Sequence, residues 1–357
     1  MGLFDLARPF VFAFPPEKAH SLSIRSLKAG ILPTRVSPPD PRLEVTLAGL
    51  RFPNPVGLAA GYDKNAEVPD EILKLGFGFC EVGTITPLAQ PGNPKPRVFR
   101  LVEDKALINR LGFNNEGHEA ALRRLKARAQ SPGIVGVNIG ANKDSADFVA
   151  DYEKGIDAFY EVASYFTANI SSPNTPGLRN LQAGKALTVL LERIFERVSA
   201  NSEKTGRTVP VFLKIAPDLE EDAMDEIAEV VKASQLSAVI VSNTTLDRSA
   251  LQYKRHANEA GGLSGAPLFE KSTRVLAKMH KRLGKDIPLI GVGGVASAKQ
   301  AIAKIEAGAS LVQLYTGMVY AGPNLPSDMV RDISRYLDQT KTRRLTDLVG
   351  VKTTDWL

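Results

Sequence analysis

Short apolar runs recur along the chain from residue 56 onward, and longer amphipathic or loop segments separate them. Each run is rich in β-branched or small apolar residues, as buried strands are. Near-continuous apolar strands that alternate with helices indicate a parallel sheet buried on both faces. We predict eight strands, at residues 56–60, 79–84, 134–139, 166–171, 211–215, 238–243, 288–292 and 310–315.

The segments between these runs favour helices around a closed barrel. Residues 222–233 and 298–307 place apolar side chains three and four positions apart, as a helix with one buried face does. An open doubly wound sheet would usually begin with a GxGxxG turn, which this sequence lacks. Residues 43–52 alternate around Gly49 and predict a hairpin that could plug the bottom of the barrel. The predicted fold is therefore α/β, a (β/α)₈ TIM barrel over residues 39–357 with an N-terminal two-helix extension.

Residues 1–38 form a separate piece with two predicted amphipathic helices. Pro15 and Pro16 interrupt the chain between them, and the second helix covers residues 17–29. The apolar stripe of the first helix consists of Leu3, Phe4, Leu6, Ala7, Phe10 and Val11. Two interpretations stay open: the helices pack onto the barrel as an ordinary extension, or they lie in the head-group region of a membrane as an interfacial anchor. Lys18, Arg25 and Lys28 favour contact with acidic lipid.

Composition and charge narrow the class of protein. A hydrophobic content of 43% and a charged content of 24% are ordinary for a globular protein. The net charge of +6 fits anionic substrates, phosphorylated cofactors or acidic lipid, and nucleic-acid binding is not expected from it. Cys80 is the sole cysteine and the four histidines lie far apart, so neither an intrachain disulfide nor a metal site is expected. The sequence shows no signal peptide and no run of ~20 apolar residues, which favours a cytoplasmic protein with at most peripheral membrane contact.

The residues at the ends of the predicted strands are unusually polar. In a TIM barrel these C-terminal strand ends converge on one site. Asparagines dominate, and the candidates are Asn109, Asn138, Asn169, Asn174 and Asn243. An amide offers donors and acceptors without charge, which suits a flat heterocycle whose edge alternates C=O and N–H groups. A lone asparagine is usually a turn residue, but several at strand ends favour a binding site.

Two lysines, Lys64 and Lys214, are predicted at the same mouth of the barrel. A lysine there is costly unless an anion accompanies it. Lys214 lies inside the apolar run VFLKIAP, and because charge in a buried strand is rare we favour a functional role over a solvated surface position. Candidate partners are a substrate carboxylate and a reduced flavin.

Glycine-rich strand ends supply a candidate phosphate site. The GVGG segment that ends at Gly294 precedes a helix start near Ser297, and Tyr315-Thr316-Gly317 follows the next strand. Backbone N–H groups of both loops could bind a phosphate, and a phosphate with a planar ring that needs a lysine points to FMN. Ser172 lies in the loop SSPNTPGLR, which is long enough to act as a lid, although a turn role is more frequent for such a serine.

Several strings resemble the class 2, quinone-linked dihydroorotate dehydrogenases. They span about residues 20–322, in the family's order: AAGYDKN, GFCEVGTITPLAQPGNPKPRVFRL, NRLGFNNEG, NISSPNTPGLR, FLKIAPDL, VSNTT, GGLSG and GVGGV. The resemblance implies oxidation of (S)-dihydroorotate to orotate in de novo pyrimidine (UMP) biosynthesis. FMN would be the hydride acceptor, and a membrane quinone, ubiquinone or menaquinone, the final electron acceptor. It further implies a peripheral enzyme on the cytoplasmic face of the inner membrane, in contact with lipid through its N-terminal helices, and we expect a monomer.

The resemblance also implies roles for single positions. Flavin contacts match Ala60, Gly61, Lys64, Thr84, Asn138, Asn169, Lys214, Ser242, Gly265, Gly294, Tyr315 and Thr316. Substrate contacts match Lys64, Asn109, Arg110, Leu111, Gly112, Phe113, Asn169, Asn174, Asn243 and Thr244. The base matches Ser172, where soluble class 1 relatives typically have a cysteine, and Cys80 on the second strand cannot take that role. His20 and Arg100 match the quinone tunnel, and Tyr62 departs from the Phe or Leu common in relatives.

The implied mechanism begins with Ser172 taking a proton from C5 of dihydroorotate. A hydride leaves C6 for the flavin N5, Lys214 stabilises the reduced ring, and the quinone enters between the N-terminal helices. A tRNA dihydrouridine synthase is the main alternative, but it would require an RNA-binding domain and a loop cysteine, and the tail after residue 325 is short and has no cysteine. A soluble class 1 enzyme is disfavoured by Ser172, and a flavin-binding barrel without catalysis is the non-enzyme alternative.

Overall fold

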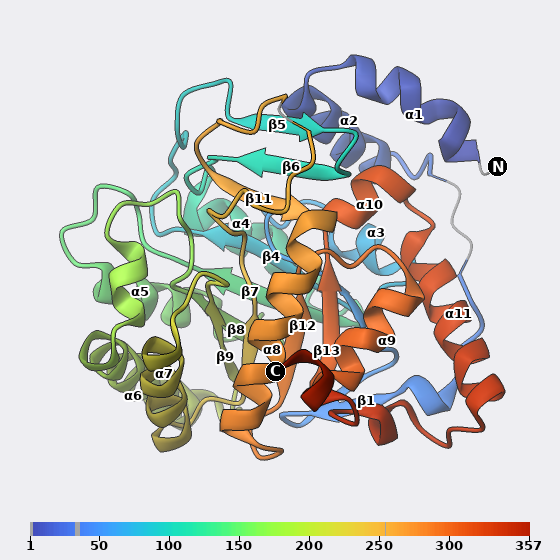
Figure 1. Ribbon diagram of the computed structural model, residues 1–357. Coiled ribbons are helices and arrows are strands. Elements are labelled where there is room, and N and C mark those ends of the chain that lie inside the picture. Colours follow the sequence, from blue (N-terminus) through green and yellow to red (C-terminus); the bar gives the residue numbers. More distant parts are fainter. Residues whose placement is uncertain (1–2, 33–35, 254) are drawn as a thin grey trace.

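A closed barrel of parallel strands forms the centre of the molecule (Figure 1). The computed structural model describes residues 3–32, 36–253 and 255–357. In chain order the barrel strands are β3 (Val56–Leu58), β4 (Phe79–Ile85), β7 (Ile134–Ile139), β8 (Tyr165–Asn169), β9 (Val211–Ile215), β10 (Ala238–Val241), β12 (Leu289–Val292) and β13 (Ala309–Leu314). Each strand pairs with the next, and β13 pairs in parallel with β3 to close the barrel. All eight predicted strands are confirmed.

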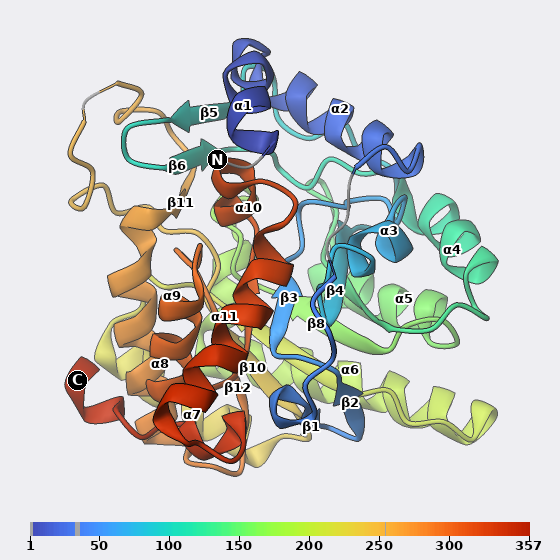
Figure 2. The same cartoon turned by 90° about the vertical axis from the view of Figure 1, so that its right-hand side faces the viewer.

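Helices form the outer layer of the barrel (Figure 2). They are α3 (Pro69–Leu73), α4 (Gly117–Ala127), α5 (Phe148–Phe159), α6 (Gly184–Thr205), α7 (Glu221–Ala233), α8 (Phe269–Leu283), α9 (Ala298–Glu306), α10 (Thr316–Ala321) and α11 (Leu325–Thr340). The predicted helices at 222–233 and 298–307 are α7 and α9. Ser297 caps α9 by accepting a hydrogen bond from the Gln300 N–H, as a serine at this position is expected to do.

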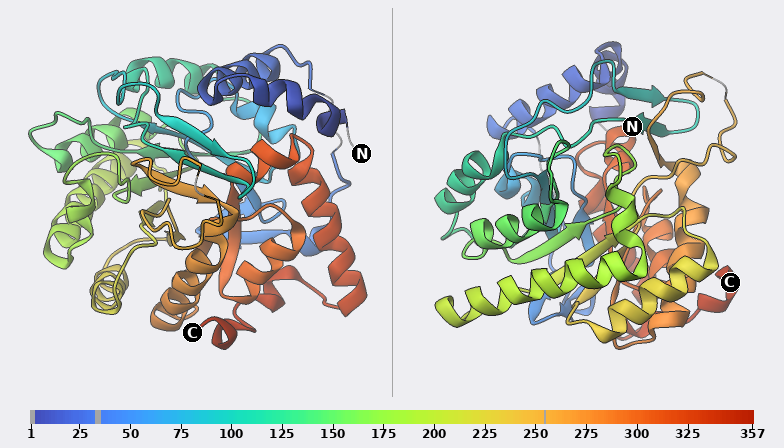
Figure 3. Two further views of the ribbon diagram at one scale, coloured as in Figure 1. Left: turned by 45° about the horizontal axis from the view of Figure 1, so that its top comes forward. Right: turned by 90° about the vertical axis from the view of Figure 1, so that its left-hand side faces the viewer.

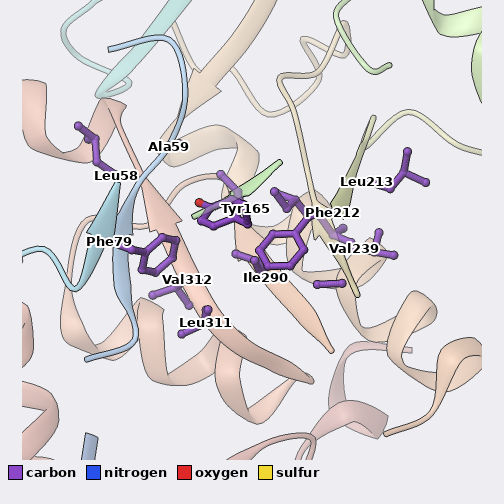
Figure 4. Packing of buried hydrophobic residues seen from close by; sticks show 14 of the residues in the cluster. Leu58, Ala59, Phe79, Tyr165, Phe212, Leu213, Val239, Ile290, Leu311 and Val312 are labelled. Carbon is purple, nitrogen blue, oxygen red and sulfur yellow. The ribbon is translucent and has the colours of Figure 1, made fainter. Parts of the chain in front are cut away.

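Large aromatic side chains fill the lower barrel (Figure 4). Tyr165 stacks on Phe212 with ring centroids 4.5 Å apart. Gly136 admits the Tyr165 ring, because a Cβ there would lie 2.1 Å from the ring. The predicted hairpin is confirmed as β1 (Val45–Leu47) and β2 (Leu50–Phe52), and it lies at the end where the strands begin. There Phe52 contacts Phe79, the first residue of β4, at 5.0 Å.

A small antiparallel sheet, absent from the sequence prediction, lies over the other end of the barrel (Figure 3). It consists of β5 (Val98–Leu101), β6 (Ala106–Asn109) and β11 (Gly262–Gly265), in the order β11-β6-β5. Its strands come from the long segments that follow β4 and β10. Phe99, Leu101, Ile108 and Leu263 give it a hydrophobic cluster of its own, so the sheet forms a rigid wall over the mouth.

The predicted N-terminal helices are α1 (Leu3–Ala13) and α2 (Pro16–Lys28). Residues 1, 2 and 33–35 of the predicted N-terminal piece lie outside the described residues. Helix α1 packs on α10, where the Phe12 and Tyr320 rings meet at 5.5 Å, and α2 is joined to the segment before β5 by a 2.6 Å Glu17–Arg97 ion pair. The helices and the residues that follow them nevertheless expose large apolar side chains, which we call the apolar face: Leu6, Phe10 and Leu22 on the helices, and Phe14 and Ile31 just beyond their ends.

Candidate active site

One cavity of about 450 Å³ lies between the strand ends, the small sheet and the N-terminal helices. It brings together most positions that the sequence singled out, although they are spread over nearly the whole chain. Those that line it are His20, Ala60, Gly61, Lys64, Thr84, Arg100, Asn109, Leu111, Gly112, Phe113, Asn169, Ser172, Asn174, Lys214, Ser242, Asn243, Thr244, Gly265, Gly294, Tyr315 and Thr316. The parallel strands explain this convergence, because their C-terminal ends all open on one face of the barrel.

Two predicted contact residues do not line the cavity. The Arg110 guanidinium forms a 2.7 Å ion pair with Glu259 and lies 4.6 Å from the centre of the Phe99 ring. Its side chain thus supports the small sheet, and only its neighbours Asn109 and Leu111 reach the cavity. Asn138 is fully buried and lies behind Thr84 and Asn169, with which it is hydrogen-bonded.

The asparagines form a connected network at the strand ends. The Asn169 Nδ2 donates to the Thr84 Oγ1 at 2.9 Å and to the Asn138 Oδ1 at 3.2 Å. The Asn243 Nδ2 donates to the Ser171 Oγ at 2.9 Å and to the Asn169 Oδ1 at 3.4 Å. Fixed in this way, the amides present an ordered set of donors and acceptors to a ligand.

Lys214, which is buried, and Lys64, which is half-buried, contribute positive charge to the cavity. Among the described residues, neither amino group has a hydrogen-bond or ion-pair partner. Burial lowers the pKa of Lys64 to about 8, an effect that the Glu17 carboxylate opposes. Burial likewise lowers the pKa of Lys214, opposed by the charge of Glu81. Because buried charges are usually paired, both lysines are suited to an anionic ligand.

Ser172 lies at the cavity wall and is 5% exposed. Its Oγ accepts a hydrogen bond from the Asn174 backbone N–H at 3.2 Å, and the Asn174 side chain in turn donates to the Asn109 backbone oxygen at 3.2 Å. The loop after β8 is therefore tied to the small sheet. A hydroxyl so shielded from water has the setting in which it can exchange a proton with a carbon atom of a ligand.

The two glycine loops after β12 and β13 touch one another. A Cβ at Gly317 would lie 2.3 Å from the Val295 carbonyl oxygen. Within the described chain, no hydrogen-bond acceptor is present for the N–H groups of Gly293 and Gly294. Unsatisfied donors at such a loop are suited to a phosphate.

The helical side of the cavity contains a cluster of rings. His20 lies 5.2 Å from the Tyr62 ring, and its Nδ1 is 3.4 Å from the Tyr315 hydroxyl. Burial, with a smaller contribution from Lys64, lowers the pKa of His20 to about 3, so the imidazole is neutral at physiological pH. The Tyr62 hydroxyl donates to the Ser23 Oγ at 3.0 Å and thereby joins the barrel to α2.

Arg100 borders the same side. It donates to the Phe14 carbonyl oxygen, and its Cζ lies 4.7 Å from the centre of the Phe12 ring.

Two buried charged residues near the site were missed by the sequence analysis. Glu81 lies inside the barrel below the asparagine network. The Lys304 Nζ donates to the Ser272 Oγ at 2.9 Å, and this hydroxyl lies 3.2 Å from the carbonyl oxygen of Gly293 in the glycine loop. The signal that identified Lys214, a charge within an apolar run, was also present in FCEVG and AIAKIEAG.

Three comparisons with known proteins agree. A family model described as dihydroorotate dehydrogenase matches residues 42–337. Dihydroorotate dehydrogenase (quinone) of Allorhizobium ampelinum is 61% identical over 350 residues, which cover 98% of this chain and 96% of that protein. The protein of the same name from Sinorhizobium medicae is 60% identical, with coverages of 99% and 98%. The solved structure of Eimeria tenella DHODH in complex with ferulenol has a TM-score of 0.90 and 38% identity, and covers 94% of this chain and 95% of that one.

Proposed function

The chain belongs to the dihydroorotate dehydrogenase family, and from this premise we propose that it oxidises (S)-dihydroorotate to orotate in pyrimidine synthesis and passes the electrons to a membrane quinone. Relatives that are about 60% identical carry the quinone-type name. They favour this activity over the soluble class 1 enzyme, the tRNA dihydrouridine synthase and the inert barrel.

The observation that carries the proposal is a single cavity with two chemically different sides. Strand ends with amides, lysines and Ser172 form one side, and apolar residues of α1 and α2 with His20 and Arg100 form the other. A polar, anionic substrate suits the first side. A quinone, whose ring carries oxygens and whose tail is apolar, suits the second.

The residues present fit FMN as the cofactor. Among the residues that the structure describes, the Lys214 amino group has no partner and is suited to the electron-rich edge of a flavin, and the N–H groups of Gly293 and Gly294, which have no acceptor there, are suited to its phosphate. The positions proposed to hold it are Ala60, Gly61, Lys64, Thr84, Asn138, Asn169, Lys214, Ser242, Gly265, Gly294, Tyr315 and Thr316. When bound, FMN supplies the hydride acceptor that no amino-acid side chain provides.

The chain's own residues bind the substrate and move its proton. Lys64 pairs with the dihydroorotate carboxylate, and the amides of Asn109, Asn174 and Asn243 hold the ring. Ser172 accepts the proton from C5 as its own hydroxyl proton leaves along a hydrogen-bond relay to solvent, which a neutral hydroxyl needs in order to act as a base. The buried surroundings of the Ser172 hydroxyl keep competing water away from this step.

The N-terminal piece serves the electron acceptor in this proposal. Residues 1–38 form the quinone side with His20 and Arg100, and residues 39–357 form the FMN-binding barrel. No helix within the described residues is long and apolar enough to cross a membrane. The apolar face supports peripheral contact with lipid instead, at the cytoplasmic face of the inner membrane. The working unit proposed here is a monomer.

The function is tested by anaerobic reduction of the purified FMN-loaded protein. Dihydroorotate is expected to bleach the flavin absorbance, and separate additions of a quinone, fumarate and NAD⁺ are expected to restore it only with the quinone. Absence of bleaching would contradict the substrate assignment. Recovery with fumarate or NAD⁺ at the rate seen with quinone would contradict the acceptor assignment.

A further inference from the structure

Lys304 is a buried lysine to which the proposed reaction gives no role. It lies on α9, has no exposed surface, and extends its amino group to the start of α8. The Nζ donates to the Ser272 Oγ at 2.9 Å and to the Thr273 Oγ1 at 3.1 Å, and it lies 5.2 Å from the centre of the Phe269 ring. Among the described residues, no carboxylate forms an ion pair with it.

The surroundings of this amino group are costly for a positive charge. Burial lowers the pKa of Lys304 to about 7, and no nearby carboxylate opposes the effect. The first turn of α8 adds to the cost, because the N-terminal end of a helix carries partial positive charge. Buried charges are usually paired, so these contacts point to an anion that the described chain does not itself supply.

Hydrogen bonds lead from Lys304 to the glycine loop after β12. An ammonium group can only donate, so the Ser272 hydroxyl accepts from it and passes its own hydrogen on. That hydrogen can go to the Phe269 carbonyl oxygen at 3.1 Å or to the Gly293 carbonyl oxygen at 3.2 Å. The Phe269 oxygen already accepts from the Thr273 hydroxyl at 2.6 Å and, as the first of α8, from the helix backbone. The Gly293 oxygen has no other donor among the described residues, so it is the acceptor that needs Ser272.

The peptide bond between Gly293 and Gly294 continues this direction to the cavity. In a trans peptide the C=O group and the following N–H group point to opposite sides. Because the Gly293 oxygen faces Ser272, the Gly294 N–H points away from α8, and Gly294 lines the cavity. The hydrogen bonds thus run from a buried cation to a backbone donor that has no acceptor within the described chain. Hydrogen bonds that follow one another in this way polarise and strengthen each other.

We propose that Lys304 is a positioning residue for the cofactor, whose buried positive charge behind the glycine loop attracts the phosphate of FMN and strengthens the Gly294 N–H as its donor. The hydrogen bonds are a property of the protein alone, but their effect on FMN rests on the proposed function. Lys304 acts through Ser272 and the loop, without touching the phosphate. A phosphate near the loop in turn favours the charged lysine, which offsets the cost of burying it.

The first test compares FMN with riboflavin, which has the same ring and ribityl chain and lacks the phosphate. Riboflavin is added to the FMN-loaded enzyme, and the proportion of the two bound flavins, measured by chromatography, gives the ratio of their Kd values. We expect Lys304→Met to reduce the preference for FMN at least about tenfold, or about 1.4 kcal/mol, because only FMN carries the charge that Lys304 attracts. A role confined to packing predicts that both flavins bind more weakly and that the ratio stays the same.

Lys281→Met is the matched control for the loss of charge. Lys281 is exposed in the last turn of α8, at the opposite end of this helix from the glycine loop. Solvent and salt screen an exposed charge at this distance, so the preference for FMN should stay within about twofold of that of the wild type.

Ser272→Ala tests the link between the lysine and the loop. It removes the hydroxyl that joins Lys304 to Gly293 and keeps the amino group, which retains Thr273 as a partner. We expect the preference for FMN to fall by about threefold to tenfold, the usual effect of one hydrogen bond. This smaller change also decides the question if Lys304→Met does not fold.

The two proposals fail separately. Wild-type enzyme that holds no flavin, or that binds riboflavin as tightly as FMN, contradicts the proposed cofactor. If the wild type prefers FMN, a preference that is unchanged in Lys304→Met or in Ser272→Ala overturns the role of Lys304. A preference that falls equally in Lys281→Met overturns it as well.

Discussion

At the scale of single residues, burial gives Lys64 a titration within the working range of pH. Its pKa is lowered to about 8, chiefly by burial, so the free enzyme loses this positive charge as the pH rises through 8. A bound carboxylate stabilises the charged lysine, so orotate binds to the enzyme in which Lys64 is protonated. We therefore expect the Kd of orotate to be nearly constant below pH 8 and to rise up to about tenfold per pH unit above it.

Orotate titrations between about pH 6 and 9.5 check this prediction, since orotate remains an anion over that range. In Lys64→Met the Kd should be high at every pH, without the inflection near 8. An orotate affinity that stays level across the range in the wild type would show that Lys64 does not meet the carboxylate.

The role of Ser172 can be tested by removing a single heavy atom, its Oγ. Ser172→Ala removes the hydroxyl that we propose as the base and leaves the Asn174 backbone in place. We expect bound FMN and the unfolding temperature to be retained, while turnover with dihydroorotate falls by about 10²–10⁴-fold, the usual contribution of a positioned base. Steady-state rates with FMN content measured on the same samples provide the check. Turnover like that of the wild type would remove Ser172 from this role.

At the scale of elements, the apolar face of α1 and α2 predicts binding to lipid vesicles. Phe10 is 76% exposed, and Leu6 is exposed on the same helix. Transfer of such side chains from water is worth roughly 1.5–3 kcal/mol each. The variant Leu6→Glu/Phe10→Glu should therefore bind vesicles that contain acidic lipid at least about tenfold more weakly. Neither residue lines the cavity, so its rate with a water-soluble short-chain quinone should be unchanged.

Val351→Glu provides the matched control for this experiment. Val351 is also exposed, but it lies in the C-terminal segment, so its replacement should leave vesicle binding intact. Sedimentation with vesicles measures all three proteins together. Equal binding by the wild type and the α1 double variant would contradict contact through the apolar face.

The elements also show what sequence alone can and cannot predict. Barrel strands such as β10 are apolar throughout because both faces are buried, and this leaves a clear pattern. The small sheet left no such pattern in the sequence, because its strands have only four residues each. In addition, β6 is stabilised by β11, which lies far along the chain. Arg110 was placed at the substrate by the resemblance alone. Its ion pair with Glu259, which turns its side chain to the small sheet, exists only in the folded chain.

The site was predicted better than the interactions that orient it. Residues at strand ends converge whenever the strands form a barrel, so position alone brought Lys214, Asn169 and Asn243 together. The direction of the Asn138 amide depends on the group behind it, and Glu81 becomes visible as that group only when the strands are paired.

At the scale of the whole molecule, closure of the barrel joins the two ends of the chain. The pairing of β13 with β3 sets Val312 beside Val56, and the C-terminal Trp356 lies against Phe269 of α8. Strand β3 therefore has an open edge until β13, the last strand of the barrel, has been made. A long sequence separation between partners is typical of slow folding.

This closure has a consequence for the N-terminal helices during synthesis. Helix α1 leaves the ribosome before the barrel strands, yet the helix on which it packs, α10, emerges only after the last of those strands. Until α10 has been made, the side of α1 that packs on it lacks this contact and is available to a chaperone or a lipid surface. The segment proposed to contact the membrane in the finished enzyme is thus also one whose packing on the barrel is completed late in synthesis.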